Sequence, residues 1–161
     1  MRTAVDFRKK WQPGLCLGLL VLTLVTGVAC QNTSTVLPTG SRDLVQPAEL
    51  VKVLASGGAK PALFYVGPRF LFAQARIRGS EFIGPTGTAA GLDSLRKRVA
   101  SMPKNAAIVI FCGCCPWDHC PNVKPAFEEL QKLGFTNVKV LYLPNNLGAD
   151  WVEKGYPFDR G

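Results

Sequence analysis

An unbroken apolar run at residues 107–112, Ala-Ile-Val-Ile-Phe-Cys, constrains the fold of this chain more than any other feature. Polar residues do not alternate with the apolar ones, so a strand formed here must be buried on both faces, as in the interior of a parallel sheet. Residues 62–66 and 138–143 are two further short, mainly apolar runs. Parallel strands need crossover connections of about a dozen residues or more, which are usually helices. The runs therefore predict an α/β domain.

Helical patterns occupy the segments around these runs. Three segments have apolar residues at the spacing of a helix that covers a sheet: residues 46–56, 92–99 and 123–133. Shorter elements are expected between them: helical turns at 70–75, a brief strand at 81–83, a loop at 84–91 and a last short helix at 151–154. The order predicts a mainly parallel central sheet flanked by helices on both faces. In such sheets, ligands bind outside the carboxyl ends of the strands.

The first 29 residues have the pattern of an export signal. The first ten carry four basic residues and one acidic residue, and an apolar run without charges follows at residues 15–29. This run is shorter than the roughly 20 residues that a membrane-spanning helix needs. The pattern therefore favours a cleaved signal over a permanent anchor.

The residue after this run is Cys30, and the polar stretch Gln-Asn-Thr-Ser-Thr follows it. This arrangement resembles a bacterial lipoprotein, in which the cysteine is lipidated and the polar stretch is a tether. We therefore expect an export signal at residues 1–29, a polar tether at 30–43 and one domain at 44–161. The protein is expected to be exported, and to be either tethered to a membrane through a lipid on Cys30 or free in the periplasm.

The charge of the chain argues against nucleic acid as a partner. Residues 1–29 hold four of the 19 basic and one of the 11 acidic residues, so the remainder has a net charge of +5. No basic helix face interleaved with aromatic residues is present in the sequence, whereas a nucleic-acid-binding domain usually has a concentrated basic surface. The modest positive charge favours solubility and contact with an anionic surface.

The cysteines indicate where the chemistry lies. Cys16 and Cys30 belong to the signal and its end, and the other four cysteines all fall within residues 112–120. A disulfide framework would normally spread its cysteines along the chain, so this crowding indicates a site. Cys112 ends the clearest predicted strand, and the loop after it leads to the predicted helix at 123–133. Backbone N–H groups of such a loop, and of the helix start, stabilise a thiolate.

Several segments together resemble the rhodanese-like family over residues 44–158. They are Pro47-Ala-Glu-Leu-Val-Lys-Val-Leu54, Ala75-Arg-Ile-Arg-Gly-Ser80, Ile108-Val-Ile-Phe-Cys112, and Leu133-Gly-Phe-Thr-Asn-Val-Lys-Val-Leu141 followed by Gly155-Tyr-Pro157. The resemblance implies a rhodanese-like α/β fold and a sulfurtransferase activity with Cys112 as the nucleophile. In such a reaction Cys112 attacks the outer sulfur of a small donor such as thiosulfate, and sulfite leaves. The resulting persulfide then passes its sulfur to an acceptor thiol or cyanide, and no cofactor is expected.

The loop after Cys112 supplies the other candidate site residues. We expect the substrate-binding loop to contain Gly113, Cys114, Cys115, Trp117, Asp118, His119, Cys120 and Lys124. Asp118 stands six places after Cys112, where phosphatase-like relatives need an arginine, and its carboxylate would repel a phosphate dianion. Phosphate chemistry is therefore not expected. Tyr65 stands at roughly the position where the family often has an acidic residue.

The same loop supports two other classes of function. The thiols and His119 are soft or borderline ligands, and Cys112-x-x-Cys115 has a spacing seen in zinc and iron–sulfur sites. No second ligand pair lies elsewhere in the chain, so no metal is expected. In an oxidising compartment Cys115 or Cys120 could pair with Cys112 and block it, or with each other and brace the loop. Either pairing would make the loop a redox module. A catalytically silent interaction domain is the third hypothesis.

Overall fold

The computed structural model describes residues 42–161. The expected export signal, the candidate lipidation site Cys30, and all of the expected tether except Arg42 and Asp43 lie outside the described residues. Within residues 42–161, no helix combines the length and the apolar character needed to cross a membrane.

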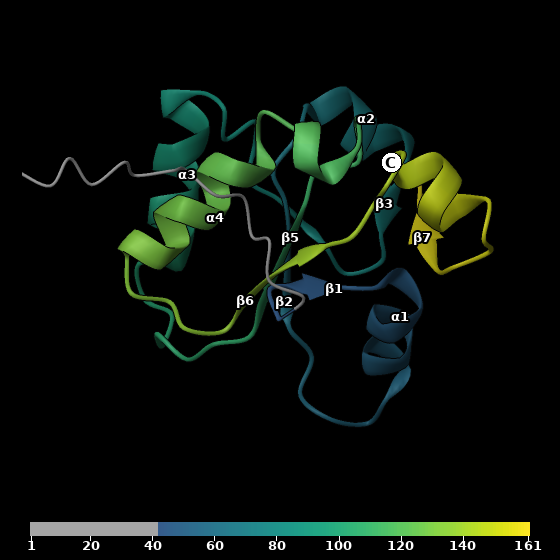
Figure 1. Cartoon of the computed structure of the whole chain (residues 1–161), viewed down its shortest axis with the longest axis horizontal. Helices are drawn as coiled ribbons and strands as arrows, with labels where there is room; N and C mark the ends of the chain where they lie inside the picture. The colour runs from purple at the N-terminus through teal and green to yellow at the C-terminus, as the bar shows by residue number, and fades with distance from the viewer. Residues whose placement is uncertain (1–41) are drawn as a thin grey trace, which may run out of the picture. The chain divides into compact units, whose positions relative to one another are not determined.

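A five-stranded sheet forms the centre of the domain (Figure 1). Its strands, in spatial order, are β1 (Leu44–Val45), β6 (Val138–Leu141), β5 (Ile108–Phe111), β2 (Ala62–Tyr65) and β4 (Glu81–Phe82). Every pairing in this sheet is parallel. The prediction of a parallel sheet is confirmed, and the apolar run at 107–112 supplies its central strand.

Successive side chains of β5 enter two separate cores, one on each face of the sheet. Ile108 and Ile110 pack in one core, together with apolar residues of α3 (Ala89–Val99) and α4 (Val123–Lys132). Val109 and Phe111 pack in the other core, with residues of α1 (Pro47–Ala55), α2 (Arg69–Gln74) and the π-helical turn η2 (Gly148–Val152). Helices therefore cover both faces, as predicted from the lack of polar alternation in this strand.

The structure differs from the predicted elements mainly at short segments and boundaries. The helix α3 begins at Ala89, three residues before the predicted start, because the Thr88 hydroxyl caps it by accepting a hydrogen bond from the Gly91 N–H at 3.1 Å. The end of the predicted loop at 84–91 is therefore helical. The first half of the predicted helix at 151–154 lies in η2, which begins earlier, at Gly148, and ends at Val152.

Three strands of two residues each were not predicted. They are β1 and the antiparallel pair β3 (Arg76–Ile77) and β7 (Phe158–Asp159). Two residues are too few to show a period in the sequence, so they leave no pattern to detect.

Candidate active site

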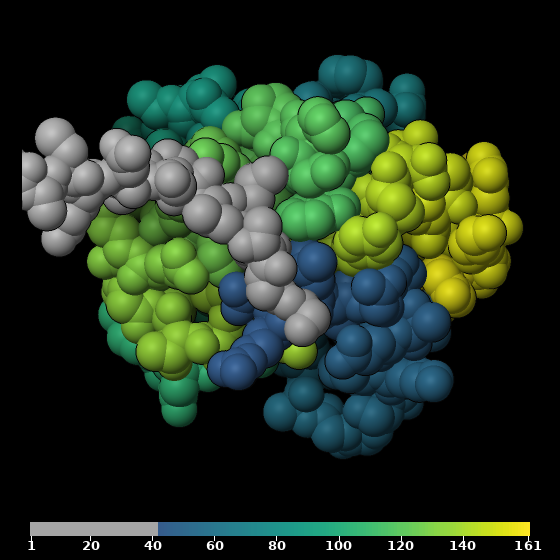
Figure 2. Space-filling model, viewed as in Figure 1, coloured from purple at the N-terminus to yellow at the C-terminus, as the bar shows by residue number. Residues whose placement is uncertain are grey.

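The loop from Cys112 to Asn122 joins the carboxyl end of β5 to the start of α4. Cys112 is the first residue after the strand and is 1% exposed. The segment after β6 holds this loop in place, because the Trp117 N–H donates to the Leu143 carbonyl at 3.0 Å and the Leu147 N–H donates to the Gly113 carbonyl at 3.1 Å. These two segments are in contact on the face shown in Figure 2, where the loop is green and the segment after β6 is yellow-green. Cys112 therefore lies at the carboxyl edge of the central strand, where the sequence places it.

Gly113 makes the sharp turn that follows Cys112. Its φ angle is +78°, in the left-handed region that glycine adopts at little cost. A Cβ atom at this position would lie 2.6 Å from the Cβ of Leu147. The turn folds Cys114 back toward Cys112. It requires a glycine because of its positive φ angle and because Leu147 leaves no room for a Cβ atom.

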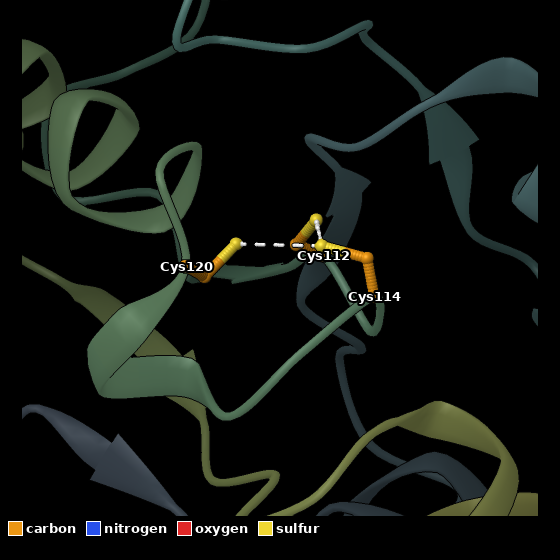
Figure 3. A group of neighbouring side chains, drawn as sticks. All are labelled: Cys112, Cys114 and Cys120. Carbon is orange, nitrogen blue, oxygen red and sulfur yellow. Dashed lines mark hydrogen bonds between the residues drawn. The ribbon is translucent and has the colours of Figure 1, made fainter.

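The thiol groups of the loop converge on Cys114 (Figure 3). The Cys114 Sγ lies 3.2 Å from the Cys112 Sγ, 3.2 Å from the Cys115 Sγ and 4.0 Å from the Cys120 Sγ. All four thiols are free of disulfide bonds. Cys112 and Cys120 are buried, whereas Cys114 is exposed. The loop therefore places one reachable thiol in contact with a buried one.

The cluster could also hold a soft metal ion. The Sγ atoms of Cys112, Cys114 and Cys120 all lie within 4.8 Å of one another. Thiolates that bind one zinc ion at about 2.3 Å in tetrahedral geometry lie about 3.8 Å apart, which is similar to the spacing here. Cys115 is close enough to Cys114 to be a fourth ligand.

Asn122 anchors the far end of the loop beneath the cluster. Its side chain accepts a hydrogen bond from the Gly87 N–H at 3.0 Å and donates one to the Cys112 Sγ at 3.5 Å. Its carbonyl accepts a hydrogen bond from the Thr86 hydroxyl. Asn122 is buried, so it connects Cys112 rigidly to the segment before α3. No pattern in the sequence singles out Asn122 as a site residue.

The thiols of Cys112 and Cys120 differ in acidity. Hydrogen bonding with Cys112, and with the N–H groups of Asn122 and Val123 at the start of α4, outweighs burial and lowers the pKa of Cys120 to about 5. The interaction with Cys120, followed by burial, raises the pKa of Cys112 above its usual range. The start of α4 therefore favours a resting thiolate at Cys120, whereas the sequence argument places it at Cys112.

A cavity of about 270 Å³ opens beside Cys112. Of the predicted site residues, Cys112, Gly113 and Cys114 line it. The other lining residues come from the ends of β2, α2 and the segment after β6: Tyr65, Leu71, Gln74, Ala75, Asn146, Leu147 and Gly148. None of these lining side chains carries a charge. The cavity is therefore suited to a small ligand with little charge of its own.

Tyr65 is the buried polar group of this cavity. Its side chain is 1% exposed, and its hydroxyl has no hydrogen-bond partner within the described residues. A Cβ atom on Gly67 would lie 2.7 Å from this hydroxyl oxygen and 2.6 Å from the Cys112 Sγ, so the two atoms flank the space that Gly67 leaves open. Burial, followed by the charges of the neighbouring thiols, raises the pKa of Tyr65 well above its usual range. The hydroxyl therefore remains protonated and can donate a hydrogen bond.

Comparison with known proteins identifies the fold. No family model and no curated protein matches the chain. Among solved structures, the Alr3790 protein from Anabaena sp. aligns with a TM-score of 0.56 at 19% identity, over 72% of this chain and 91% of that one. The solution structure of the rhodanese-like domain of the same protein aligns with a TM-score of 0.55 at 19% identity, over 74% and 80% of the two chains. The fold is rhodanese-like.

A further structural match is the BH2092 protein from Bacillus halodurans. It aligns with a TM-score of 0.57 at 16% identity, over 74% of this chain and 77% of that chain. At these identities the likeness concerns the fold, and the chemistry must be argued from the site itself. The fold expected from the sequence resemblance is thus confirmed.

The remaining predicted site residues lie in the loop and in the first turn of α4, outside the lining of the cysteine cavity. Trp117, Asp118 and His119 form a 3-10 turn, η1 (Trp117–His119). The Trp117 ring packs against Tyr142, with ring centroids 6.0 Å apart, and a carboxylate oxygen of Asp118 lies 2.9 Å from the Nδ1 of the exposed His119. Lys124 lies in the first turn of α4, and its Nζ is 4.0 Å from the Oε1 of Glu128. Within residues 42–161, the lining of the cysteine cavity includes none of these predicted residues.

Proposed function

We propose that this domain is a sulfurtransferase in which Cys112 carries sulfane sulfur as a persulfide. The observation that supports this most strongly is the position of the Cys112 Sγ, at the carboxyl end of the central strand and beside a cavity, in a rhodanese-like fold. The backbone N–H of Cys114 and the side-chain amide of Asn122 both donate toward this sulfur. These donors would stabilise negative charge on the Cys112 sulfur.

The reaction takes place in two steps. Cys112 gives its proton to the neighbouring Cys120 thiolate and attacks the outer sulfur of the donor. The sulfur–sulfur bond of the donor breaks, and the leaving group departs with the electron pair. With thiosulfate the leaving group is sulfite. The outer sulfur of the persulfide then lies in the cavity, where the Tyr65 hydroxyl donates to it, until an acceptor thiol or cyanide removes it.

The uncharged lining of the cavity favours a donor of low charge. A dianion such as thiosulfate would lose hydration on entering, and no cationic side chain in the lining replaces it. A small alkyl hydropersulfide is neutral when protonated and avoids this cost. We therefore expect a higher kcat/KM with an alkyl hydropersulfide than with thiosulfate.

A single-turnover assay tests the activity. Reduced protein mixed with thiosulfate and excess cyanide should release sulfite and form thiocyanate, and Cys112→Ser should abolish both. Cys115→Ser is the matched control and should retain both products, because its thiol lies against Cys114 and not at the end of β5. Equal product formation by Cys112→Ser and the wild type would refute the proposal.

Soft-metal binding is the second candidate function, favoured by the three Sγ atoms that lie within 4.8 Å of one another. Metal analysis of protein purified without chelators, combined with thiol counting before and after chelation, tests it. A stoichiometric zinc or copper content that masks three or four thiols would support this function, and it would block sulfur transfer by occupying Cys112. Metal-free protein with four reactive thiols in the loop would refute it.

A further inference from the structure

The proposed sulfur transfer uses Cys112 and leaves the central thiol of the cluster unexplained. Cys114 contacts Cys112, Cys115 and Cys120, and it is the exposed member of the contact pair with Cys112. We propose that Cys114 is a resolving thiol, which attacks the Cys112 persulfide and releases its outer sulfur as sulfide. This inference rests on the proposed function, and it defines the acceptor as a dithiol reductant.

The step balances without any further reactant. The Cys114 thiolate attacks the Sγ of Cys112, a bond forms between the two Sγ atoms, and the bond from the Cys112 Sγ to the outer sulfur breaks. The outer sulfur leaves with the electron pair as HS⁻, so the sulfane sulfur is reduced by two electrons and the two cysteine thiols are oxidised to a disulfide. An external dithiol then reduces this disulfide by thiol–disulfide exchange and returns both cysteines to thiols.

The geometry of the turn favours this pair. The Sγ atoms of Cys112 and Cys114 are 3.2 Å apart, and a disulfide bond requires about 2.05 Å, so they need approach by only about 1.2 Å. Gly113, with its φ of +78°, folds the two flanking side chains onto the same side of the chain. A disulfide across so short a segment closes a small ring, and strained disulfides are easily reduced. The product is thus suited to rapid turnover.

Accessibility distinguishes Cys114 from the other thiols. Cys120 is 3% exposed and packs in the hydrophobic core beneath the loop, so an external dithiol could not readily reach a disulfide that it formed with Cys112. The sulfur contact of Cys115 is with Cys114, at 3.2 Å. Cys114 alone, among the described thiols, combines contact with Cys112 and exposure to solvent.

The experiment follows sulfur in the full chain, reduced and then freed of small thiols. Thiosulfate is added without cyanide or any other acceptor, and sulfite, sulfide and free thiols are measured. The wild type should release about one sulfide for each sulfite and lose two free thiols per molecule. Cys114→Ser should release sulfite, retain the sulfur as a persulfide detectable by mass, and release no sulfide until a dithiol is added. Ser94→Ala, on the exposed face of α3, is the control and should behave like the wild type.

The outcomes separate this inference from the proposed function. Sulfite release with a stable persulfide in both the wild type and Cys114→Ser would overturn the resolving role and leave the sulfurtransferase intact. Absence of sulfite release from the wild type would overturn the proposed function itself. Loss of sulfide release in Cys120→Ser, with release retained in Cys114→Ser, would overturn the assignment to Cys114. Sulfite release by Cys114→Ser also verifies that this variant is folded.

Discussion

Replacing Tyr65 with phenylalanine tests whether a buried group is kept for function at the expense of stability. The Tyr65 hydroxyl is buried with no hydrogen-bond partner in the described part of the chain, and it lies beside the proposed persulfide. Its ring packs against Phe72, Phe82 and Phe111, at centroid distances of 5.2, 6.3 and 5.4 Å. Tyr65→Phe removes the hydroxyl and leaves these ring contacts in place.

The expected change in stability follows from the missing partner. A buried polar group without a hydrogen bond costs the folded state about 1–3 kcal/mol, and a phenylalanine of the same shape does not incur this cost. We expect Tyr65→Phe to raise the free energy of unfolding by about 1 kcal/mol, at the lower end of this range. For a domain of this size that corresponds to a rise in Tm of roughly 3–6 °C.

The expected change in activity has the opposite sign. A hydroxyl that donates to the transferred sulfur stabilises the charge that develops there, and removal of one such donor at an oxyanion costs about 10²–10³ in rate. Sulfur is a weaker acceptor than oxygen, so we expect Tyr65→Phe to reduce single-turnover sulfite release by about 10-fold.

Urea unfolding and the single-turnover assay measure the two effects on the same samples. Tyr142→Phe is the control, because Tyr142 is only partly buried and its change should be within about 0.5 kcal/mol. A Tyr65→Phe protein that is less stable than the wild type by 1 kcal/mol or more would show that the hydroxyl has a partner in the folded protein. Unchanged sulfite release would show that the hydroxyl takes no part in the reaction.

Three other predictions concern the turn, the surface charges and export. Gly113→Ala should lower the free energy of unfolding by about 1–3 kcal/mol, because an alanine with this φ angle is strained and its Cβ atom contacts Leu147. It should also reduce sulfite release. Urea unfolding measures the first effect. Arg98 holds the pKa of Glu81 below its usual range, so the stability that this exposed pair adds, at most about 1 kcal/mol, is present above the usual carboxyl pKa of about 4.3. This stability should be lost as the pH falls through the lower, folded-state pKa. The free energy of unfolding of Glu81→Gln should therefore differ from that of the wild type more at pH 7 than near pH 3. Cys30→Ser should reduce detergent partitioning if the chain is a lipoprotein, and unchanged partitioning would contradict that expectation.

The parallel sheet could be predicted because burial on both faces leaves a mark in the sequence. The run from Ile108 to Phe111 is fully apolar, and a strand with one solvent-exposed face would alternate. The start of α3 could also have been found, since Thr88 is a good N-cap residue and the helical spacing begins soon after it. The exposure of Val53 in α1 could not be predicted. The helical spacing of apolar residues identifies the face of a helix that packs against the protein, but it does not show how much of that face a neighbouring element covers.

The sequence predicted part of the residues that the structure brings together at the candidate site. Trp117, Asp118 and His119 were predicted as site residues because they are close to Cys112 in the sequence. The 3-10 turn that they form places them outside the lining of the cavity. Tyr65 could have been found, because it ends the strand beside β5, and the carboxyl ends of parallel strands meet at one edge. Asn122 left no such signal, since its contacts with Cys112 and Gly87 depend on how the loop closes against the segment before α3.

Charge connects the thiol cluster, the cavity and the expected substrate. The N–H groups at the start of α4 stabilise one thiolate, at Cys120, and a second thiolate among four crowded sulfurs is opposed by the first. The cavity lining adds no cationic side chain that could offset a charged donor. A donor that arrives uncharged, receives a hydrogen bond from Tyr65 and leaves its sulfur on Cys112 adds the least new charge to this site. Release of that sulfur as sulfide through Cys114 then removes the charge from the cavity in each turnover, because the anion departs and the cysteines become a neutral disulfide.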